Sequence, residues 1–155
     1  MEQATPMIME WQRNKYMIST DPKWIDRELV HKYLSEESYW AKNIPFDVVS
    51  KSLDHSLCFG VFEEGQEMVG FARILSDYAT FAYIMDVFIL PPSRGIGLSK
   101  WLMECILAHP DLQGLRAWSL KTNDAHGLYR QYGFELTKHP EKIMERVVQN
   151  PYPSH

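Results

Sequence analysis

The sequence predicts an α/β fold, in which a mixed, mostly antiparallel central sheet of about six or seven strands is flanked by about four helices. Three observations predict it. Two apolar runs, residues 57–62 and 68–75, are separated by a short turn, as in an antiparallel hairpin. Residues 81–90 are almost all apolar, as in a strand covered on both faces. A helical pattern over residues 95–109 then leads to another apolar run, which predicts a strand–helix–strand crossover.

The first part of the chain is expected to form a strand and two helices. Residues 16–20 have the pattern of a short strand. Residues 22–34 carry apolar side chains at helical spacing and have a proline in the first turn. A loop over residues 35–44 separates this helix from a second, shorter one over residues 45–53.

The last part of the chain is expected to contribute strands and one more helix. The helix over residues 95–109 is ended by a proline. A strand over residues 115–120 follows, and then a short helix over residues 124–132, which the next glycine closes as a C-terminal cap. We expect two further strands, at residues 134–137 and 143–147.

Length and composition are those of one globular domain. Of the 155 residues, 45% are hydrophobic and 23% are charged, which excludes a chain that is mainly disordered. We expect a single domain over residues 1–155, with its core at about residues 16–137 and a tail from about residue 140.

Charge and cysteine usage narrow the functional class. The 16 Lys and Arg and 20 Asp and Glu give a net charge of −4 without a basic run, so we expect no nucleic-acid partner. The longest apolar stretches have only about ten residues, so we expect no membrane partner. Cys58 and Cys105 lie in apolar contexts without partners at metal-ligand spacing, which predicts no metal site and a location in the reducing cytoplasm.

The most informative segment is the turn between the apolar strand and the central helix. Residues 94–99 read Arg-Gly-Ile-Gly-Leu-Ser and open the helix. Glycines allow a ligand to approach the backbone closely, and the N–H groups of a helix start attract anions. A phosphate site is one interpretation, and an ordinary turn into a helix is the other. The segment is neither the dinucleotide-binding fingerprint nor a Walker loop.

This segment resembles the acetyl-CoA signature of the GNAT N-acetyltransferase superfamily, Gln/Arg-x-x-Gly-x-Gly/Ala. Here it reads Arg94-x-x-Gly97-x-Ser99, with serine in place of the final Gly or Ala. Downstream, residues 123–134 contain Asn, Ala, Leu-Tyr and Gly-Phe in the order of the family's second motif. The resemblance covers most of the chain, from about residue 16 to residue 137.

The resemblance implies that acetyl-CoA is the cosubstrate. The backbone of the strand end would pair with the pantetheine arm, the glycine turn would hold the pyrophosphate, and Asn123 would contact the CoA arm. Asn123 has the alternative role of helix N-cap. A homodimer is also an expectation at the level of the family. The cofactor-binding residues implied are Phe88, Ile89, Leu90, Arg94, Gly95, Ile96, Gly97, Leu98, Ser99 and Asn123.

Tyr129 and Asp86 are the candidate catalytic residues. In the family a tyrosine at the position of Tyr129 lies near the CoA sulfur, where it can protonate the leaving thiolate; the alternative is a core tyrosine. Asp86 is the single charge in the apolar strand. A carboxyl group buried without partners holds its proton more tightly, which suits a general base or the anchor of a water chain. The alternative for Asp86 is a salt bridge.

Three aromatic residues, Tyr39, Trp40 and Phe46, are expected to roof the acceptor site, unless they only pack between the two helices. We therefore expect an N-acetyltransferase that acts on a primary amine of a small molecule by direct attack in a ternary complex. A non-catalytic acyl-CoA-binding module or sensor of the same fold, and an acetyltransferase of protein or peptide amines, are the alternatives.

Overall fold

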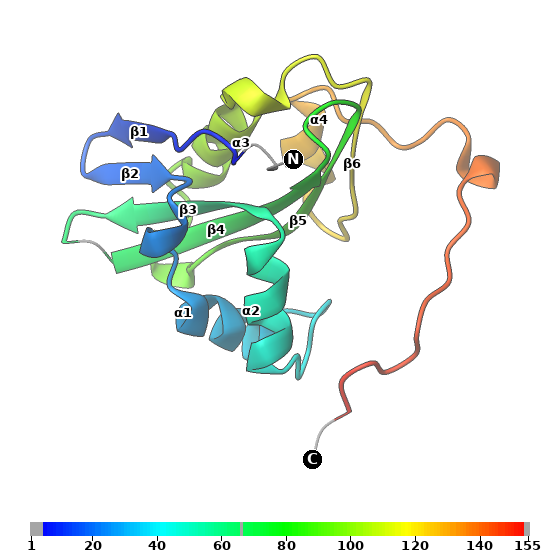
Figure 1. Cartoon of the computed structure of the whole chain (residues 1–155), viewed down its shortest axis with the longest axis horizontal. Coiled ribbons are helices and arrows are strands. Elements are labelled where there is room, and N and C mark those ends of the chain that lie inside the picture. The colour runs from blue at the N-terminus through cyan, green and yellow to red at the C-terminus, as the bar shows by residue number, and fades with distance from the viewer. Residues whose placement is uncertain (1–4, 66, 154–155) are drawn as a thin grey trace.

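The structure is a computed structural model and describes residues 5–65 and 67–153. One sheet runs through it, with the strands side by side in chain order (Figure 1). All neighbours are antiparallel except β5 and β6, which are parallel. The predicted mixed, mostly antiparallel sheet is thus confirmed. Its strands are β1 (Glu10–Arg13), β2 (Tyr16–Ser19), β3 (Leu57–Glu63), β4 (Glu67–Ser76), β5 (Phe81–Ile89) and β6 (Ala117–Leu120).

Helices cover both faces of the sheet, as predicted (Figure 1). On one face Phe71 and Phe88 pack with apolar residues of the first two helices. On the other face Ile74 and Ile84 pack with the third and fourth helices. Full burial of each such side chain contributes about 1.5–3 kcal/mol to stability. The helices are α1 (Arg27–Lys32), α2 (Phe46–Asp54), α3 (Leu98–Ala108) and α4 (His126–Arg130).

The predicted helix over residues 22–34 is divided in the structure. A 3-10 turn, Pro22–Trp24, is capped by Asp21, and α1 starts separately with Asp26 as its N-cap. The chain then widens into a π-helical turn, Tyr33–Glu37, which begins at the end of the predicted helix and extends into the segment predicted as a loop. The backbone is extended at Ile25 and Asp26, and the Asp26 carboxylate accepts from the Leu29 N–H, so a second helix start divides the predicted helix.

The central helix starts later than predicted. Gly95 and Gly97 have φ angles of +84° and +86°, and α3 begins only at Leu98. These angles lie in the left-handed region, which a right-handed helix cannot use. With 11 residues α3 is the longest of the described helices, and within the described residues none is long and apolar enough to cross a membrane.

The N-terminal strand β1 was not predicted. It forms a hairpin with β2 through a turn in which Asn14 has a φ angle of +55°. Its Trp11 stacks on Phe59 of β3, with ring centroids 6.1 Å apart. The short segment shows no clear alternation, so its pairing with β2 and its contact with the core decide its conformation.

The two predicted C-terminal strands are wrong. From Phe134 onward the chain is extended, leaves the body of the molecule and forms only a 3-10 turn, Pro140–Lys142 (Figure 1, orange to red). A strand is stable only beside another strand that completes its hydrogen bonds, and no described strand pairs with residues 134–137 or 143–147. β6 is therefore the last strand of a six-stranded sheet.

Candidate active site

A cleft opens where β5 and β6 separate. The two strands pair only from Phe81 to Ile84 of β5. β5 continues to Ile89, and no described strand accompanies this second half on the β6 side. Apart from the Ile89 carbonyl, which accepts from Arg94, the outer backbone groups of this half of β5 can hydrogen-bond an extended ligand, as at an open strand edge.

A bulge in β5 lies at the start of this cleft. The register between β4 and β5 shifts after Phe71, so that Asp86 and Val87 together face Ala72. Asp86 has a φ angle of +54°, in the left-handed region. A bulge bends its strand and redirects the side chain of the extra residue. Here it separates β5 from β6 and places Asp86 at the cleft.

The three residues predicted to bind pantetheine, Phe88, Ile89 and Leu90, differ in the direction of their backbone groups. The N–H of Leu90 donates to the carbonyl of Val69 in β4 at 2.8 Å. Because backbone groups alternate in an antiparallel strand, those of Phe88 also face β4, while those of Ile89 face the cleft. Phe88 is instead buried in the core, stacked on Tyr33 at 4.0 Å between centroids. Of the three residues, Ile89 has the backbone aimed at the cleft.

The predicted phosphate turn exposes a set of backbone donors. No side chain caps α3, and the N–H groups from Gly95 to Lys100 have no acceptor among the described residues. The first bonded N–H is that of Trp101, which donates to Gly97 at 3.1 Å. A Cβ on Gly95 or Gly97 would meet no atom within 4 Å. The turn is therefore open, and its free donors at the positive end of the α3 dipole fit an anionic group such as a pyrophosphate.

The backbone N–H groups of this turn are free, whereas its side chains contact the rest of the protein or the solvent. Arg94 bends back, and its Nε donates to the carbonyl of Ile89 at 2.8 Å while its Nη2 donates to the Tyr33 hydroxyl at 3.1 Å. Leu98 is buried in the core beneath α3, whereas Ile96 is exposed. Ser99 is half-buried in the first turn of the helix. Arg94 thus fixes the turn against β5.

A cavity of about 410 Å³ lies in the cleft beyond the bulge. It brings together both predicted catalytic residues, two of the three predicted roof residues and Asn123. Phe46 is not among its lining residues: it stands on the first turn of α2 with its ring edge-on to His31. The lining residues are Tyr39, Trp40, Tyr83, Ile84, Met85, Asp86, Val87, Leu120, Lys121, Thr122, Asn123, Asp124, Ala125 and Tyr129.

Tyr129 lines the cavity from α4 and is only 8% exposed. Its ring packs edge-on against Phe134, with centroids 6.1 Å apart. The pKa of Tyr129 is raised to about 12, mainly by burial and to a smaller extent by the neighbouring Tyr39 and Asp124. The hydroxyl has no hydrogen-bond partner among the described residues, so it keeps a proton that it can donate into the cavity.

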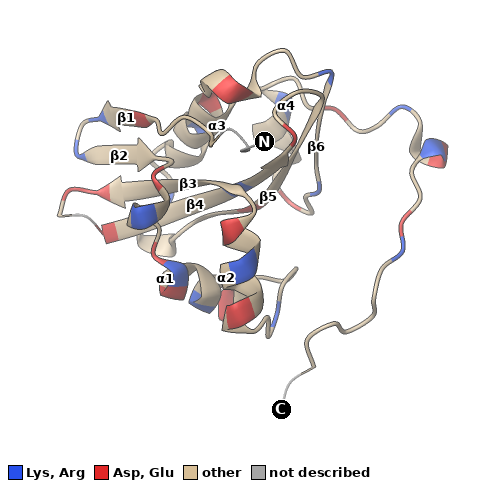
Figure 2. Ribbon diagram, viewed as in Figure 1, with Lys and Arg blue, Asp and Glu red and all other residues tan. Residues whose placement is uncertain are grey.

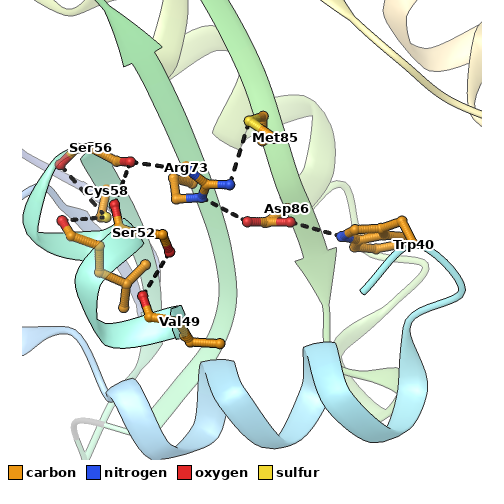
Figure 3. Close-up of polar contacts among 9 residues, drawn as sticks. Trp40, Val49, Ser52, Ser56, Cys58, Arg73, Met85 and Asp86 are labelled. Atoms are coloured by element: carbon orange, nitrogen blue, oxygen red, sulfur yellow. Dashed lines mark hydrogen bonds and ion pairs between the residues drawn. The ribbon is translucent and has the colours of Figure 1, made fainter. Parts of the chain in front are cut away.

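Asp86 is not an isolated carboxylate. Arg73 of β4 donates from Nε to Oδ2 at 2.7 Å, and Trp40 donates from its indole N–H to Oδ1 at 2.8 Å (Figure 3). The two charged side chains are 11% and 7% exposed. The alternative of a salt bridge is confirmed, and the premise of a buried carboxyl without partners is wrong. Whether Asp86 also takes a proton in catalysis remains a prediction.

Arg73, the ion-pair partner of Asp86, was not among the predicted site residues. Its Nη1 donates to the Ser56 hydroxyl at 3.2 Å, and Ser56 donates to the carbonyl of Ser52 at 2.7 Å (Figure 3). The end of α2 is thereby joined to Asp86. A signal was present in the sequence, because Arg73 is the only charged residue in the apolar run 68–75, just as Asp86 is in the run 81–90.

Tyr39 and Trp40 join the two walls of the cleft. Trp40 binds Asp86 on β5, while the Tyr39 hydroxyl accepts from the backbone N–H of Asn123, after β6, at 3.2 Å. The two rings meet edge-on, with centroids 5.0 Å apart. They are 56% and 42% exposed, so they cover one side of the cavity rather than fill a core between helices.

Asn123 does not cap α4. The Thr122 hydroxyl accepts from the N–H groups of Asp124 at 3.4 Å and Ala125 at 3.0 Å and so prepares the helix start. Asn123 is exposed beside it at the cavity. The described residues contain no cluster of three or more His, Cys, Asp or Glu that could hold a metal ion.

Known proteins share this architecture. The model of the "Acetyltransferase (GNAT) family" matches residues 8–134. A Xanthomonas campestris pv. campestris structure described as a "putative acetyltransferase belonging to the GNAT family" is 52% identical, with a TM-score of 0.86, over 90% of this chain and 97% of its own. A Gibberella zeae protein named "putative acetyltransferase" is 31% identical over 140 residues, 77% of this chain and 78% of that protein. A Clostridium acetobutylicum structure described as a "predicted acetyltransferase with acetyl-CoA" shares the fold (TM-score 0.56, 18% identity, 90% of this chain and 98% of its own).

The Arg73–Asp86 pair leads to a prediction for stability. Arg73→Met removes the cation and leaves a buried carboxylate uncompensated, so the free energy of unfolding should fall by about 3–5 kcal/mol in urea titrations. Arg13→Met is the matched control, because Arg13 pairs with Glu104 at the surface, where both side chains are about half exposed. It should cost less than about 1 kcal/mol. Equal losses in the two variants would contradict this description of the pair.

Proposed function

The chain belongs to the GNAT acetyltransferase family, and we propose that it is an N-acetyltransferase that moves the acetyl group of acetyl-CoA to the primary amine of a small molecule. Both substrates bind at once, and the amine attacks the thioester directly. The cavity between β5 and β6 is the place of reaction, with Tyr129 on one wall and Asp86 on the other.

The bridge formed by Tyr39 and Trp40 is the observation that supports a small acceptor. It is bonded to both walls of the cleft and closes one side of a cavity of about 410 Å³. This volume is within the usual range for small-molecule sites, about 300–1,000 Å³. A polypeptide would need an open groove for the chain on both sides of its amine. The aromatic faces also suit an amine that arrives as a cation.

The cosubstrate follows the open edge of β5. In this proposal the pyrophosphate lies on the free N–H groups between Gly95 and Lys100, where the α3 dipole favours negative charge. The pantetheine arm pairs with the cleft-facing N–H of Ile89, whose carbonyl is held by Arg94, and its thioester reaches the bulge at Asp86 and Val87. The acetyl-CoA held by the Clostridium acetobutylicum protein supports this assignment through the shared fold.

Tyr129 is the proton donor of the proposed reaction. Acetyl-CoA supplies an acetyl group activated as a thioester. The ammonium form of a primary amine has a pKa of about 10.4, so the acceptor arrives protonated and first loses a proton, here to water in the cavity. The amine nitrogen then bonds to the acetyl carbon, the carbon–sulfur bond breaks, and Tyr129 donates its hydroxyl proton to the departing sulfur. The nitrogen releases its second proton to water in the cavity, and a proton returns from that water to the Tyr129 oxygen, which leaves a neutral amide and a neutral thiol.

The buried setting of Tyr129 suits this role. With its pKa raised to about 12 by burial, the hydroxyl is protonated throughout the neutral range. Burial penalises any anion, so it also raises the pKa of a thiolate that leaves into the same cavity. Burial of the thiolate therefore makes it a stronger base, which favours transfer of the Tyr129 proton to the sulfur.

Asp86 acts through Trp40 in this proposal. Both of its carboxylate oxygens are already held by donors, one from Arg73 and one from Trp40. It fixes the indole that covers the acceptor and is therefore a positioning residue. The general-base role considered from the sequence is the competing assignment.

Loss of the phosphate turn should abolish cosubstrate binding. Gly97→Trp puts an indole into the open space over the free N–H groups. Calorimetric titration should give micromolar acetyl-CoA binding for the wild type and a dissociation constant at least about a hundredfold higher for the variant. Gly65→Trp is the matched control, because Gly65 also has a positive φ and open space but lies in the β3–β4 turn. Wild-type protein that binds no acetyl-CoA would overturn the proposal.

Tyr129→Phe should lower kcat about a hundredfold without changing the dissociation constant of acetyl-CoA. Because the pKa of Tyr129 is about 12, the wild type and the variant should have pH–rate profiles of the same shape between about pH 6 and pH 9. Tyr132→Phe is the control, since the Tyr132 hydroxyl binds the carbonyl of Lys100 outside the cavity. An unchanged kcat in Tyr129→Phe would exclude Tyr129 as the acid. A wild-type protein that binds acetyl-CoA but acetylates no amine would favour the alternative function, a non-catalytic acyl-CoA sensor.

A comparison of Trp40→Phe with Asp86→Asn separates positioning from base catalysis. Trp40→Phe deletes the indole N–H and keeps the carboxylate. If Asp86 acts through Trp40, both variants should raise the acceptor KM by about tenfold, which corresponds to the loss of one charged hydrogen bond. A kcat that falls in Asp86→Asn but not in Trp40→Phe would instead assign the base to Asp86.

A further inference from the structure

A second hollow, of about 510 Å³, lies on the sheet beside the reaction cavity, and its walls are mostly apolar. Leu75 and Phe81 are each 38% exposed, and Tyr83 and Met85 are half-buried. These four side chains belong to neither of the two apolar clusters that the described residues form. They are therefore available to a ligand. The apolar groove, as we call it, is lined by Leu75, Ser76, Asp77, Phe81, Tyr83 and Met85.

The groove is open because β4 extends past the elements that cover its face. Along β4 the side chains of Phe71, Arg73 and Leu75 point to the same face, since they alternate with period two. Phe71 is buried with residues of the first two helices, and Arg73 reaches Ser56, just after the end of α2. Leu75 lies beyond both α2 and the first residue of β3, Leu57, which pairs with Ile74.

The groove is continuous with the cavity in which the reaction is proposed. Tyr83 and Met85 line both hollows. The sulfur of Met85 lies 3.4 Å from Nη2 of Arg73, the residue that holds Asp86 (Figure 3). Tyr83 pairs with Leu75 across the two strands, so the same face leads from the cavity into the groove.

The groove also lies away from the place assigned to the cosubstrate. In the proposed function the pantetheine arm follows the second half of β5, from the bulge at Asp86 toward α3. The groove is on the first half of β5, at residues 81–85. The bridge of Tyr39 and Trp40 covers one side of the cavity. The groove is thus an apolar continuation of the cavity that neither the cosubstrate nor the bridge occupies.

We propose that the amine acceptor carries an uncharged apolar arm, an alkyl chain or an aromatic ring, and that this arm lies in the groove. The inference rests on the proposed function and names the class of its acceptor. The amine lies in the cavity, and the arm runs over Tyr83 and Met85 to Leu75 and Phe81. Binding removes these side chains from water, which is the source of the preference for an apolar arm.

The charges around the groove exclude an arm that ends in a carboxylate. Charged residues lie along α1 and α2 but are few on β4 and β5 (Figure 2). Among the described residues that line the groove, the single charged one is Asp77, and no Lys or Arg is present. The hydroxyl and the backbone N–H of Thr80 donate to Asp77 and hold the pKa of its carboxyl well below the usual range. Asp77 is therefore an anion at neutral pH and repels another one.

A series of primary amines tests the arm. In the wild type, kcat/KM measured from the release of the CoA thiol should rise about fourfold with each methylene from propylamine to hexylamine, mainly through KM. Aminocaproate, which ends a similar chain in a carboxylate, should be at least about tenfold poorer than hexylamine. Equal values for propylamine and hexylamine would overturn the arm and leave the proposed function standing. A protein that acetylates no amine would overturn both.

Leu75→Asp tests the groove itself. The ratio of kcat/KM for hexylamine to that for propylamine should fall at least about tenfold, because the arm would meet a carboxylate. The ratio for hexamethylenediamine to hexylamine should rise at least about tenfold, since the second ammonium group of the diamine faces the new carboxylate. Loss of folded protein changes neither ratio. Val48→Asp, at a position on α2 that is 37% exposed, is the matched control and should keep the wild-type ratios.

Two results with Leu75→Asp would overturn the proposal. Ratios equal to those of the wild type would show that no arm lies in the groove. A change in the mass of the protein in solution, measured by light scattering, together with unchanged ratios would show that the groove is a contact surface between proteins.

Discussion

The buried carboxylate of Asp86 is the constraint on which the site depends. A carboxylate that is 7% exposed must have partners, because an unpaired buried charge is very costly. Arg73 on β4 and Trp40 on the loop before α2 supply them. The same interactions therefore hold the bulge in β5, the end of α2 and the aromatic cover of the cavity in one arrangement. Loss of the Arg73–Asp86–Trp40 interactions would therefore lower the stability of the fold and disturb the geometry of the site together.

The sheet leaves hydrogen-bonding groups unsatisfied where a ligand would meet them. β5 pairs with β4 on both sides of the bulge at Asp86 and Val87, but β6 accompanies only its first half. The turn before α3 likewise keeps its N–H groups free, because two left-handed glycines and the absence of a capping side chain leave it open. In the free protein these groups are open to water, and an extended, anionic ligand that occupies the cleft takes the place of that water. The site is thus prepared by the backbone as much as by side chains.

Local patterns predicted much of the fold and several members of the site. The hairpin, the buried strand and the crossover helix follow from hydrophobic periodicity, and Asp86 and Tyr129 do line one cavity. Partners between distant segments were not predictable in the same way. Arg73 is 13 residues from Asp86, and a shift of the β4–β5 register would have turned it to the other face. Phe46 is an aromatic beside the predicted roof, yet its helix directs it to His31.

The sequence by itself determined the kinds of elements, their order and the turn that opens α3, because periodicity, prolines and glycines act over a few residues. Only the tertiary structure decided which groups meet. The bulge at Asp86, the bridge from Tyr39 and Trp40 to both walls, and the position of the C-terminal tail all depend on contacts between residues far apart in the chain. The apolar residues of the tail have the pattern of a strand, but a strand forms only where a neighbour completes its hydrogen bonds, and that neighbour is not fixed by local sequence.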